Sequence, residues 1–277
     1  MTKTAFVTGA SSGIGEATVR QLIADGFQVF AAARRTDRMA PLAEQGAILV
    51  PLDVTDDVSM VAAIEDVRRK AGRLDLLVNN AGYGSYGALE DVAMDEARRQ
   101  VEVNLMGLAR MCQLALPLMR AQGSGRIINI TSVGGKFHEP FGAWYHATKF
   151  AVEGLSDCLR VEVKPFGIDV VVIEPGAILT EWNKIARDGL VAASGSSDYA
   201  PYARRHAAML AGADESKMTS LPDVVARTIG RAATARRPHT RYATGGGARI
   251  VLFLRSILSD RMFDRLVWAI SQSPKPV

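Results

Sequence analysis

The chain has 277 residues, of which 48% are hydrophobic and 22% are charged, as in an ordinary globular protein that can bury a sizeable core. The formal net charge is only +4 and no nucleic-acid recognition motif accompanies it, so nucleic acid is not an expected partner. Because no uncharged apolar run reaches about eighteen residues and the first residues do not resemble a signal peptide, we expect a cytoplasmic protein without a transmembrane helix.

Apolar runs alternate with amphipathic segments through the first two-thirds of the chain, which is the pattern of a parallel sheet flanked by helices. Strands are expected at residues 4–8, 28–33, 47–52, 74–79, 125–131 and 168–173. Helices are expected at residues 16–25, 57–71, 94–120 and 145–163, although Gly107 and Pro117 disfavour continuity in the third. We therefore predict a Rossmann-type α/β fold, a doubly wound parallel sheet of about seven strands, in a single domain of residues 1–277.

Residues 181–220 are rich in Ala, Gly and Ser, and they interrupt the alternation just after the sixth expected strand. Ligands approach an open α/β sheet at the carboxyl ends of its strands. We therefore predict a substrate lobe or lid here, with a surface excursion without function as the alternative.

Residues 248–272 form an apolar C-terminal segment interrupted by arginines. From Arg227 to Arg265 the chain has nine arginines and two acidic residues. The segment could pack on the protein's own core, pack against an oligomer partner, or make peripheral contact with an anionic membrane surface. Packing is the favoured interpretation.

The two cysteines, Cys112 and Cys158, lie within apolar helical patterns, and we expect both to be buried, reduced thiols. No group of histidines, cysteines and carboxylates has metal-ligand spacing, so no metal site is predicted.

A glycine-rich turn, Thr8-Gly9-Ala10-Ser11-Ser12-Gly13-Ile14-Gly15, lies between the first expected strand and the first expected helix. Glycines there allow a tight turn and let a pyrophosphate approach the backbone, while the helix N-terminus supplies N–H groups. The turn therefore predicts a dinucleotide site.

The spacing T-G-x-x-x-G-x-G resembles that of the short-chain dehydrogenases, and the resemblance continues through most of the chain. Further motifs in the family's order are Asp53-Val54, Asn79-Asn80-Ala81-Gly82, Asn104, Ser132, Tyr145-x-x-x-Lys149, and Pro175-Gly176 with Thr180. By this resemblance, the pyrophosphate would meet Gly9, Ser11, Ser12, Gly13, Ile14 and Gly15. The adenine and its ribose would meet Asp53, Val54, Asn80, Ala81 and Gly82, and the nicotinamide would meet Tyr145, Lys149, Pro175, Gly176, Ile178 and Thr180.

The end of the second strand indicates which cofactor binds. An NAD-binding fold usually has a carboxylate there, but this chain has Ala33 followed by Arg34 and Arg35. A guanidinium binds a 2′-phosphate through charge-assisted hydrogen bonds, with Ser11 as a neutral helper. We therefore predict NADP(H).

Four residues are the predicted catalytic group. Tyr145 and Lys149 share one helix face, and we expect the ammonium to lower the pKa of the phenol so that it exchanges a proton with a carbonyl or alcohol. The resemblance makes Ser132 the hydroxyl that orients the substrate oxygen, and Asn104 part of a water-linked proton relay to Lys149. His138 and His146 invite a serine–histidine hydrolase interpretation, but no G-x-S-x-G motif is present, so we expect surface or pocket-lining histidines.

The predicted reaction is hydride transfer between nicotinamide and a carbonyl or secondary alcohol. Residues 83–90 and 174–177 look similar to the hydroxysteroid- and retinol-dehydrogenase-like branch, which implies a lipophilic ketone or alcohol. An apolar pocket wall is expected from Phe137, Phe141, Trp144, Trp182 and Ile185. A redox sensor without turnover and an isomerase are the alternatives, and the resemblance implies a homodimer or homotetramer.

Overall fold

Seven parallel strands form one sheet in the computed structural model, in the order β3-β2-β1-β4-β5-β6-β7. The model describes residues 2–273, so Met1 and residues 274–277 of the predicted domain lie outside the described residues. The strands are β1 (Thr4–Thr8), β2 (Gln28–Ala33), β3 (Ile48–Pro51), β4 (Leu76–Asn79), β5 (Gly125–Ile130), β6 (Ile168–Pro175) and β7 (Arg241–Thr244). The predicted doubly wound α/β fold is confirmed.

The central strands are buried on both faces. All five residues of β1 are buried, and β1 pairs in parallel with β2 on one side and β4 on the other. Near-continuous apolar runs suit such positions because helices cover both faces of a parallel sheet. The strand order reverses between β1 and β4, which places a topological switch point at their carboxyl ends.

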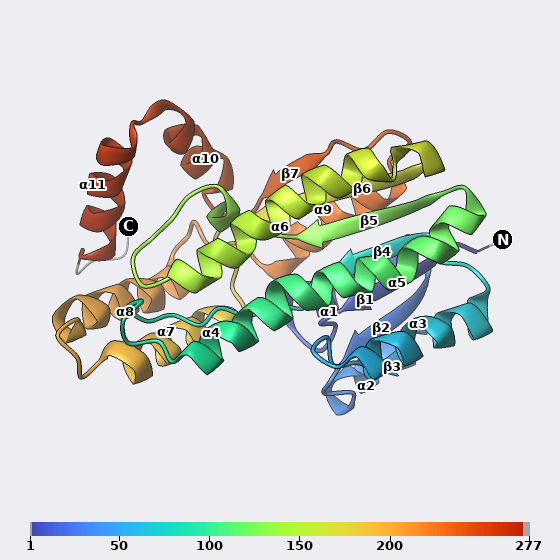
Figure 1. Ribbon diagram of the computed structural model, residues 1–277, viewed down its shortest axis with the longest axis horizontal. Coiled ribbons are helices and arrows are strands. Elements are labelled where there is room, and N and C mark those ends of the chain that lie inside the picture. Colours follow the sequence, from blue (N-terminus) through green and yellow to red (C-terminus); the bar gives the residue numbers. More distant parts are fainter. Residues whose placement is uncertain (1, 274–277) are drawn as a thin grey trace.

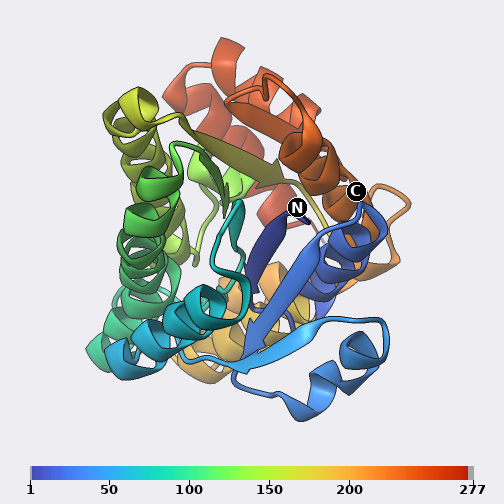
Figure 2. The same cartoon turned by 90° about the vertical axis from the view of Figure 1, so that its right-hand side faces the viewer.

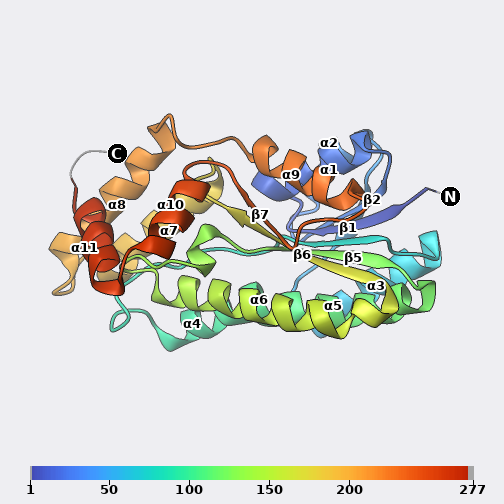
Figure 3. The ribbon, with the colours of Figure 1, turned by 90° about the horizontal axis from the view of Figure 1, so that it is seen from above.

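One face of the sheet is covered by α1 (Gly13–Ala24), α2 (Ala40–Glu44) and α9 (Pro222–Thr234), as Figure 3 shows. Their buried residues recur at helical spacing, for example Val19 and Leu22 in α1 and Val225 and Ile229 in α9, and they share one core cluster with β1 and β2.

The opposite face is covered by α3 (Asp57–Ala71), α5 (Gly107–Gln122) and α6 (Ala143–Glu162). Figure 2 shows the sheet between these two helix layers. Buried residues of α3 and α5 form a second core cluster against the sheet, and this cluster includes Cys112. Cys158 is exposed, so the prediction that both thiols are buried is wrong for Cys158, which lies on the outer side of α6.

The expected helix at residues 94–120 is interrupted. The chain forms α4 (Met94–Val101), then a π-helical turn over Glu102–Met106, and then α5. Gly107 follows the turn, where an added Cβ would lie 2.4 Å from the carbonyl oxygen of Val54, so close backbone contact requires glycine. The expected break in the helix therefore lies next to Gly107 and not at Pro117, which lies within α5.

Two helical pairs extend beyond the carboxyl ends of the strands (Figure 1). Residues 181–220 contain α7 (Glu181–Ser194) and α8 (Ala200–Glu215), which pack on each other. The C-terminal pair is α10 (Ala248–Ile257) and α11 (Asp260–Ser271). Among the described residues, no helix is long and apolar enough to cross a membrane.

The C-terminal pair is packed on one side only. Phe263 of α11 is buried and contacts the rings of Phe137 and His138 in the loop after β5. Phe253 and Ile257 on the outer side of α10 are 61% and 58% exposed. Packing on the protein's own core therefore explains the apolar residues on the inner side of this helical pair, but not those on its outer side.

The seventh strand, which no sequence pattern located, is joined to the sheet by Arg241. Its guanidinium donates to Glu153 at 3.0 Å and to Asp157 at 2.6 Å, both on α6. Glu153 is almost fully buried and also accepts from the Thr131 hydroxyl and pairs with Lys136. A buried carboxylate needs such partners, so Arg241 links β7, α6 and the end of β5.

We expect Arg241→Ala to lower the free energy of unfolding by about 2 kcal/mol. The buried Glu153 carboxylate would keep Lys136 and Thr131 as partners but lose its ion pair with Arg241. Urea denaturation would measure this, with Arg249→Ala as the control. Arg249 is exposed and has no ion pair within residues 2–273, so its loss should cost under about 0.5 kcal/mol. Equal losses in the two variants would contradict this role of Arg241.

Candidate active site

The glycine turn lies at the switch point, against the end of β4. Gly9 has φ +68°, and a Cβ on it would lie 2.9 Å from Cα of Ala81. A Cβ on Gly15 would lie 2.1 Å from the carbonyl oxygen of Gly9, so neither position accepts a side chain. Gly13 begins α1 after the N-cap residue Ser12, and Ile14 follows in the first turn. The turn therefore has the backbone shape of an anion cradle.

Hydrogen bonds fasten this turn to β4. The Thr8 hydroxyl accepts from the backbone N–H groups of Asn80 and Ala81, both at 3.0 Å. The Asn80 side-chain amide donates to the carbonyl oxygens of Thr8 and Gly9. The amide nitrogen of Asn80 donates both of these hydrogen bonds, so the side chain stabilises the shape of the glycine turn. The predicted contact of Asn80 with the ribose stays a prediction.

Arg34 and Arg35 lie exposed beyond β2, which ends at Ala33 without a carboxylate. The Arg35 guanidinium is 3.4 Å from the Ser11 hydroxyl, so the predicted pair of phosphate ligands is brought together. No sequence pattern pointed to Glu181, whose carboxylate lies 3.6 Å from Arg35 and 3.0 Å from Arg38. The start of α7 thus contacts the predicted 2′-phosphate site.

Asp53 and Val54 follow β3, as predicted for an adenine site. The Asp53 carboxylate accepts from both the backbone N–H and the hydroxyl of Thr55, which leaves it at the surface of a tight turn. Val54 is buried beside Gly107.

Tyr145 lies in the first turn of α6, and only 8% of it is exposed. The Ser132 hydroxyl interacts with the phenol oxygen in the direction that lowers the phenol pKa, and it accepts from the N–H of Gly134 at 3.0 Å. Burial raises the pKa of Tyr145 to about 12, and the interaction with Ser132 opposes this only in part. The expected lowering of the phenol pKa by Lys149 is therefore wrong for this arrangement: burial outweighs every favourable contact, and the phenol stays protonated at neutral pH.

Lys149 is buried one helical turn after Tyr145. Its ammonium donates to the carbonyl oxygen of Ile130 at 3.0 Å and lies 5.8 Å from the centre of the Tyr145 ring. Burial lowers the pKa of Lys149 to about 8, while the nearby Glu153 carboxylate works in the opposite direction. Both protonation states of this amine are accessible near neutral pH.

Asn104 lies in the π-helical turn and is buried. Its side chain accepts from the N–H of Tyr83, donates to the carbonyl oxygen of Tyr83 at 2.8 Å, and donates to the Thr148 hydroxyl. A Cβ on Gly82 would lie 3.2 Å from its oxygen. The side chain therefore fixes the 82–83 backbone, and its predicted relay to Lys149 stays a prediction.

The residues after β6 lie beside the same cleft. Pro175 accepts a hydrogen bond from Ser132 at 3.4 Å, and Gly176 packs too closely on Gly246 to carry a side chain. Ile178 is buried, and Thr180, the N-cap of α7, would lie 3.1 Å from a Cβ on Gly13. The glycine turn and the start of the lobe are thus adjacent.

An aromatic wall covers the Tyr145 phenol. The Trp182 indole lies 5.0 Å from the Tyr145 ring and 5.6 Å from the Tyr86 ring, measured between ring centres. A Cβ on Gly84 would lie 2.5 Å from this indole, so Gly84 makes the space for it. Of the expected wall residues, Phe141 and Trp182 belong here, whereas Ile185 is 46% exposed and Phe137 packs behind His146.

Two further residues, Tyr86 and His206, belong to this aromatic wall although neither was expected there from the sequence. Tyr86 is almost fully buried, and its hydroxyl donates to Glu139 at 2.6 Å. His206 on α8 is fully buried and stacks on Tyr86. Ala203, His206, Ala207 and Leu210 follow the i, i+3, i+4, i+7 pattern, so helical periodicity carried a signal for this buried face.

The histidines near Ser132 have structural contacts. His146 is buried: its Nδ1–H donates to the carbonyl oxygen of Gly134 at 2.8 Å, and its Nε2 accepts from the N–H of Glu139. Both partners fix one neutral tautomer, so His146 braces the turn after Ser132. His138 lies at the surface, 2.8 Å from Asp264 of α11. Neither histidine activates a serine nucleophile.

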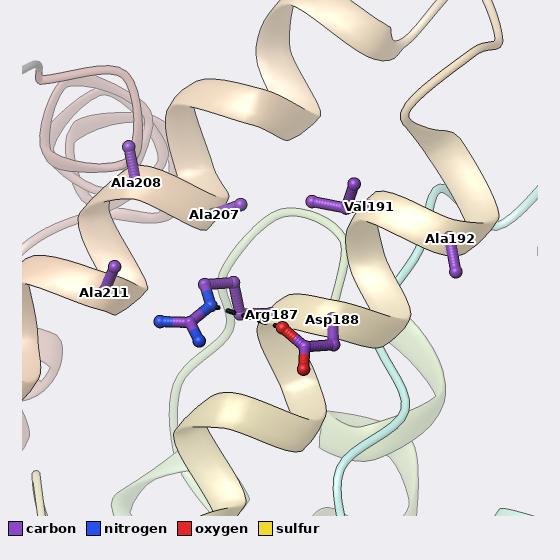
Figure 4. Close-up of a pocket in the computed structure, with 7 residues that line it drawn as sticks. All are labelled: Arg187, Asp188, Val191, Ala192, Ala207, Ala208 and Ala211. Carbon is purple, nitrogen blue, oxygen red and sulfur yellow. Dashed lines mark hydrogen bonds and ion pairs between the residues drawn. The ribbon is translucent and has the colours of Figure 1, made fainter.

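A separate groove lies between α7 and α8 and is shown in Figure 4. No predicted catalytic or cofactor residue lines it; its lining is Arg187, Asp188, Val191, Ala192, Ala207, Ala208 and Ala211. Among residues 2–273, no cluster of histidines, cysteines and carboxylates could hold a metal ion.

Known proteins are similar to this chain in sequence and in fold. The family model for short chain dehydrogenase matches residues 3–190. A 3-ketodihydrosphingosine reductase from Bacteroides thetaiotaomicron is 41% identical over 62% of both chains, and an NADPH-dependent 3-dehydrocapnine reductase from Ornithobacterium rhinotracheale is 32% identical over 95% of both.

The crystal structure of a short-chain dehydrogenase from Streptomyces avermitilis superimposes with a TM-score of 0.77 at 32% identity, covering 97% of this chain and 96% of the other. Strands β1 to β6, the glycine turn and the Tyr145 region all lie within the stretch that the family model matches. The chain belongs to the short-chain dehydrogenase family of oxidoreductases.

Proposed function

We propose that the protein is an NADP(H)-dependent reductase of lipophilic ketones, working in reverse as an alcohol dehydrogenase. The observation that carries this proposal is the buried Tyr145 phenol, which interacts with Ser132 and is protonated at neutral pH. A protonated phenol can act as the general acid that gives a proton to the ketone oxygen during reduction.

The residues at the switch point fit a nicotinamide dinucleotide. The side-chain-free surfaces of Gly9, Gly13 and Gly15 leave room for a pyrophosphate against the N-terminus of α1. Bound nicotinamide would supply the hydride for the substrate carbon. Ile178 and Thr180 lie beside the glycine turn, on the side of the cleft nearest Ser132 and Tyr145.

The chain's own residues supply the proton. Ser132 hydrogen-bonds to the substrate oxygen and orients it toward Tyr145, whose hydroxyl donates its proton as the carbonyl is reduced. Lys149, whose burial lowers its pKa to about 8, can then return a proton to the site at neutral pH. Asn104 fixes the backbone at Tyr83 beside this group.

The preference for NADP(H) rests on charge at the end of β2. Arg34 and Arg35 lie there with Ser11, and no carboxylate ends the strand. The 3-dehydrocapnine reductase relative is NADPH-dependent, which supports the same choice. Glu181 competes with the phosphate for Arg35, so we assign the main contact to Arg34.

The lipophilic substrate is inferred from the wall. Trp182, Tyr86 and Phe141 surround Tyr145 with aromatic surface, and α7 and α8 act as the substrate lobe of a single domain. One relative is named for a 3-keto sphingosine, which agrees with an apolar ketone.

A redox sensor without turnover is the second candidate. The observation in its favour is the Trp182 indole, which covers the phenol and would have to move before a carbonyl could reach it. The complete group of Ser132, Tyr145 and Lys149 argues against it, because a sensor needs no proton donor.

Two predicted partners stay predictions. Peripheral membrane contact would use the exposed outer side of α10, where Arg249 lies beside Ile250 and Phe253. Assembly as a homodimer or homotetramer is inferred from the family alone.

The first test follows nicotinamide absorbance with NADPH and NADH against a panel of aliphatic, steroid and aromatic ketones. We expect turnover of apolar ketones with NADPH preferred. Arg34→Ala should raise KM for NADPH about 10- to 100-fold and leave KM for NADH unchanged, since it removes charge-assisted hydrogen bonds. Tight NADPH binding without turnover of any ketone would favour the sensor, and an NADH preference in wild type would overturn the cofactor choice.

The second test measures the cost of burying Lys149. Its folded pKa, about 8, lies below its ordinary 10.5, so the unfolded state binds more protons between these values and wild-type stability rises with pH there. Lys149→Met should therefore be more stable than wild type by roughly 3 kcal/mol at pH 7, and the gain should fall below half at pH 9.5.

Denaturant titrations at the two pH values would measure this gain. Lys164→Met is the control, because Lys164 is exposed and its loss should give a small difference that does not change with pH. A Lys149→Met protein that is less stable than wild type at pH 7 would show that the hydrogen bond to Ile130 outweighs the burial cost.

A further inference from the structure

His206 is a buried polar residue whose burial the fold does not explain. Its side chain is fully buried on α8, and neither ring nitrogen has a hydrogen-bond partner within the part of the chain that the structure describes. Burying an imidazole without partners costs free energy that a leucine or phenylalanine of similar size would not. We therefore expect the imidazole at this position to form a hydrogen bond that packing alone does not require.

The surroundings of His206 connect it to the proton donor. Its ring stacks on Tyr86 with 6.2 Å between centres and an interplanar angle of 13°, and the Tyr86 ring lies 5.9 Å from the Tyr145 ring. His206 and Tyr145 belong to the same buried cluster of the lobe or its border, on either side of Tyr86. Their separation therefore cannot exceed the sum of those two ring distances.

A strained residue lies on the other side of His206. Phe141 has φ +67°, which is unfavourable for a bulky side chain, and its ring lies 5.6 Å from the imidazole. Strain of this kind persists where the surroundings fix the conformation, and it is concentrated at ligand sites. Here the backbone is fixed by the hydrogen bond from Gly87 N–H to the Phe141 carbonyl oxygen.

We propose that His206 is a second recognition point of the substrate site, which hydrogen-bonds to a neutral hydroxyl or similar group on the substrate, remote from the ketone reduced at Tyr145. This inference rests on the proposed ketone reductase function and names its substrate class: an apolar ketone with a second hydrogen-bonding group. Trp182, which packs on both Tyr145 and Tyr86, would have to move for a substrate to reach both points.

The charge around His206 selects a neutral partner. Burial lowers the pKa of His206, so the ring is neutral and offers one N–H donor and one acceptor, which a hydroxyl can match. Glu139 is the nearby acid and His146, Tyr86 and Tyr145 are the other titratable neighbours. The Glu139 carboxylate disfavours a substrate carboxylate at this point.

The test compares 2-alkanones with their ω-hydroxy counterparts at eight, ten and twelve carbons, using NADPH and the whole chain. For wild type we expect kcat/KM to favour the hydroxyketone by about 10- to 100-fold at one chain length, because the spacing of the two groups is fixed. His206→Phe should abolish this preference, so that kcat/KM falls about 10- to 100-fold further for the hydroxyketone than for the plain ketone, and it should raise Tm, since it removes an unpaired buried group. His206→Gln should retain part of the preference.

Three outcomes would overturn the proposal: no preference at any chain length in wild type, equal losses for both ketones in His206→Phe, or a lowered Tm in that variant. Quenching of tryptophan fluorescence by the same ketone pairs measures binding without turnover. If no ketone is turned over but the hydroxyketone binds in a way that depends on His206, the reductase function is contradicted and the His206 subsite is supported. If the plain ketones are turned over but the hydroxyketones are not preferred, the reductase function is supported and the His206 subsite is contradicted.

Discussion

The burial of the Tyr145 phenol is the constraint on which the account of this protein depends. The first turn of α6 places the ring under Trp182 and beside Tyr86, where solvent is nearly excluded. Exclusion of water raises the pKa of the phenol and keeps its proton, which suits the proposed role of this group as a general acid. The same exclusion lowers the pKa of Lys149, so the two neighbours are shifted in opposite directions by one cause.

The rest of the site follows from close packing at the carboxyl edge of the sheet. Gly9 and Gly15 allow the β1–α1 turn to touch the end of β4, and Thr8 and Asn80 lock that contact with hydrogen bonds. The π-helical turn at Asn104 reaches the same edge and fixes Tyr83. Together these contacts bring the predicted cofactor surface and the proton donor to one cleft without any metal ligand in residues 2–273.

Much of this was predictable from the sequence, because parallel strands with apolar runs and a glycine turn leave strong local signals. β1 and β2 were located to the residue, and the α/β fold and the family were correct. The contacts that depend on distant packing were not predictable. Residues Arg241–Thr244 form a short strand after an arginine-rich loop, and only the partners of Arg241 on α6 show why it joins the sheet. The position of Trp182 over Tyr145, and the pKa of Tyr145, likewise follow from how α7 packs against the first turn of α6.

We propose that Tyr145 donates the proton in ketone reduction and that NADPH binding depends mainly on the glycine turn and Arg34. The most direct measurement is the rate of ketone-dependent NADPH oxidation by Tyr145→Phe, together with the Kd for NADPH. We expect kcat to fall by about 10²- to 10⁴-fold while the Kd for NADPH changes little, because phenylalanine packs like tyrosine and lacks only the hydroxyl that donates the proton. A Tyr145→Phe protein that reduces ketones at the wild-type rate would contradict this proposal.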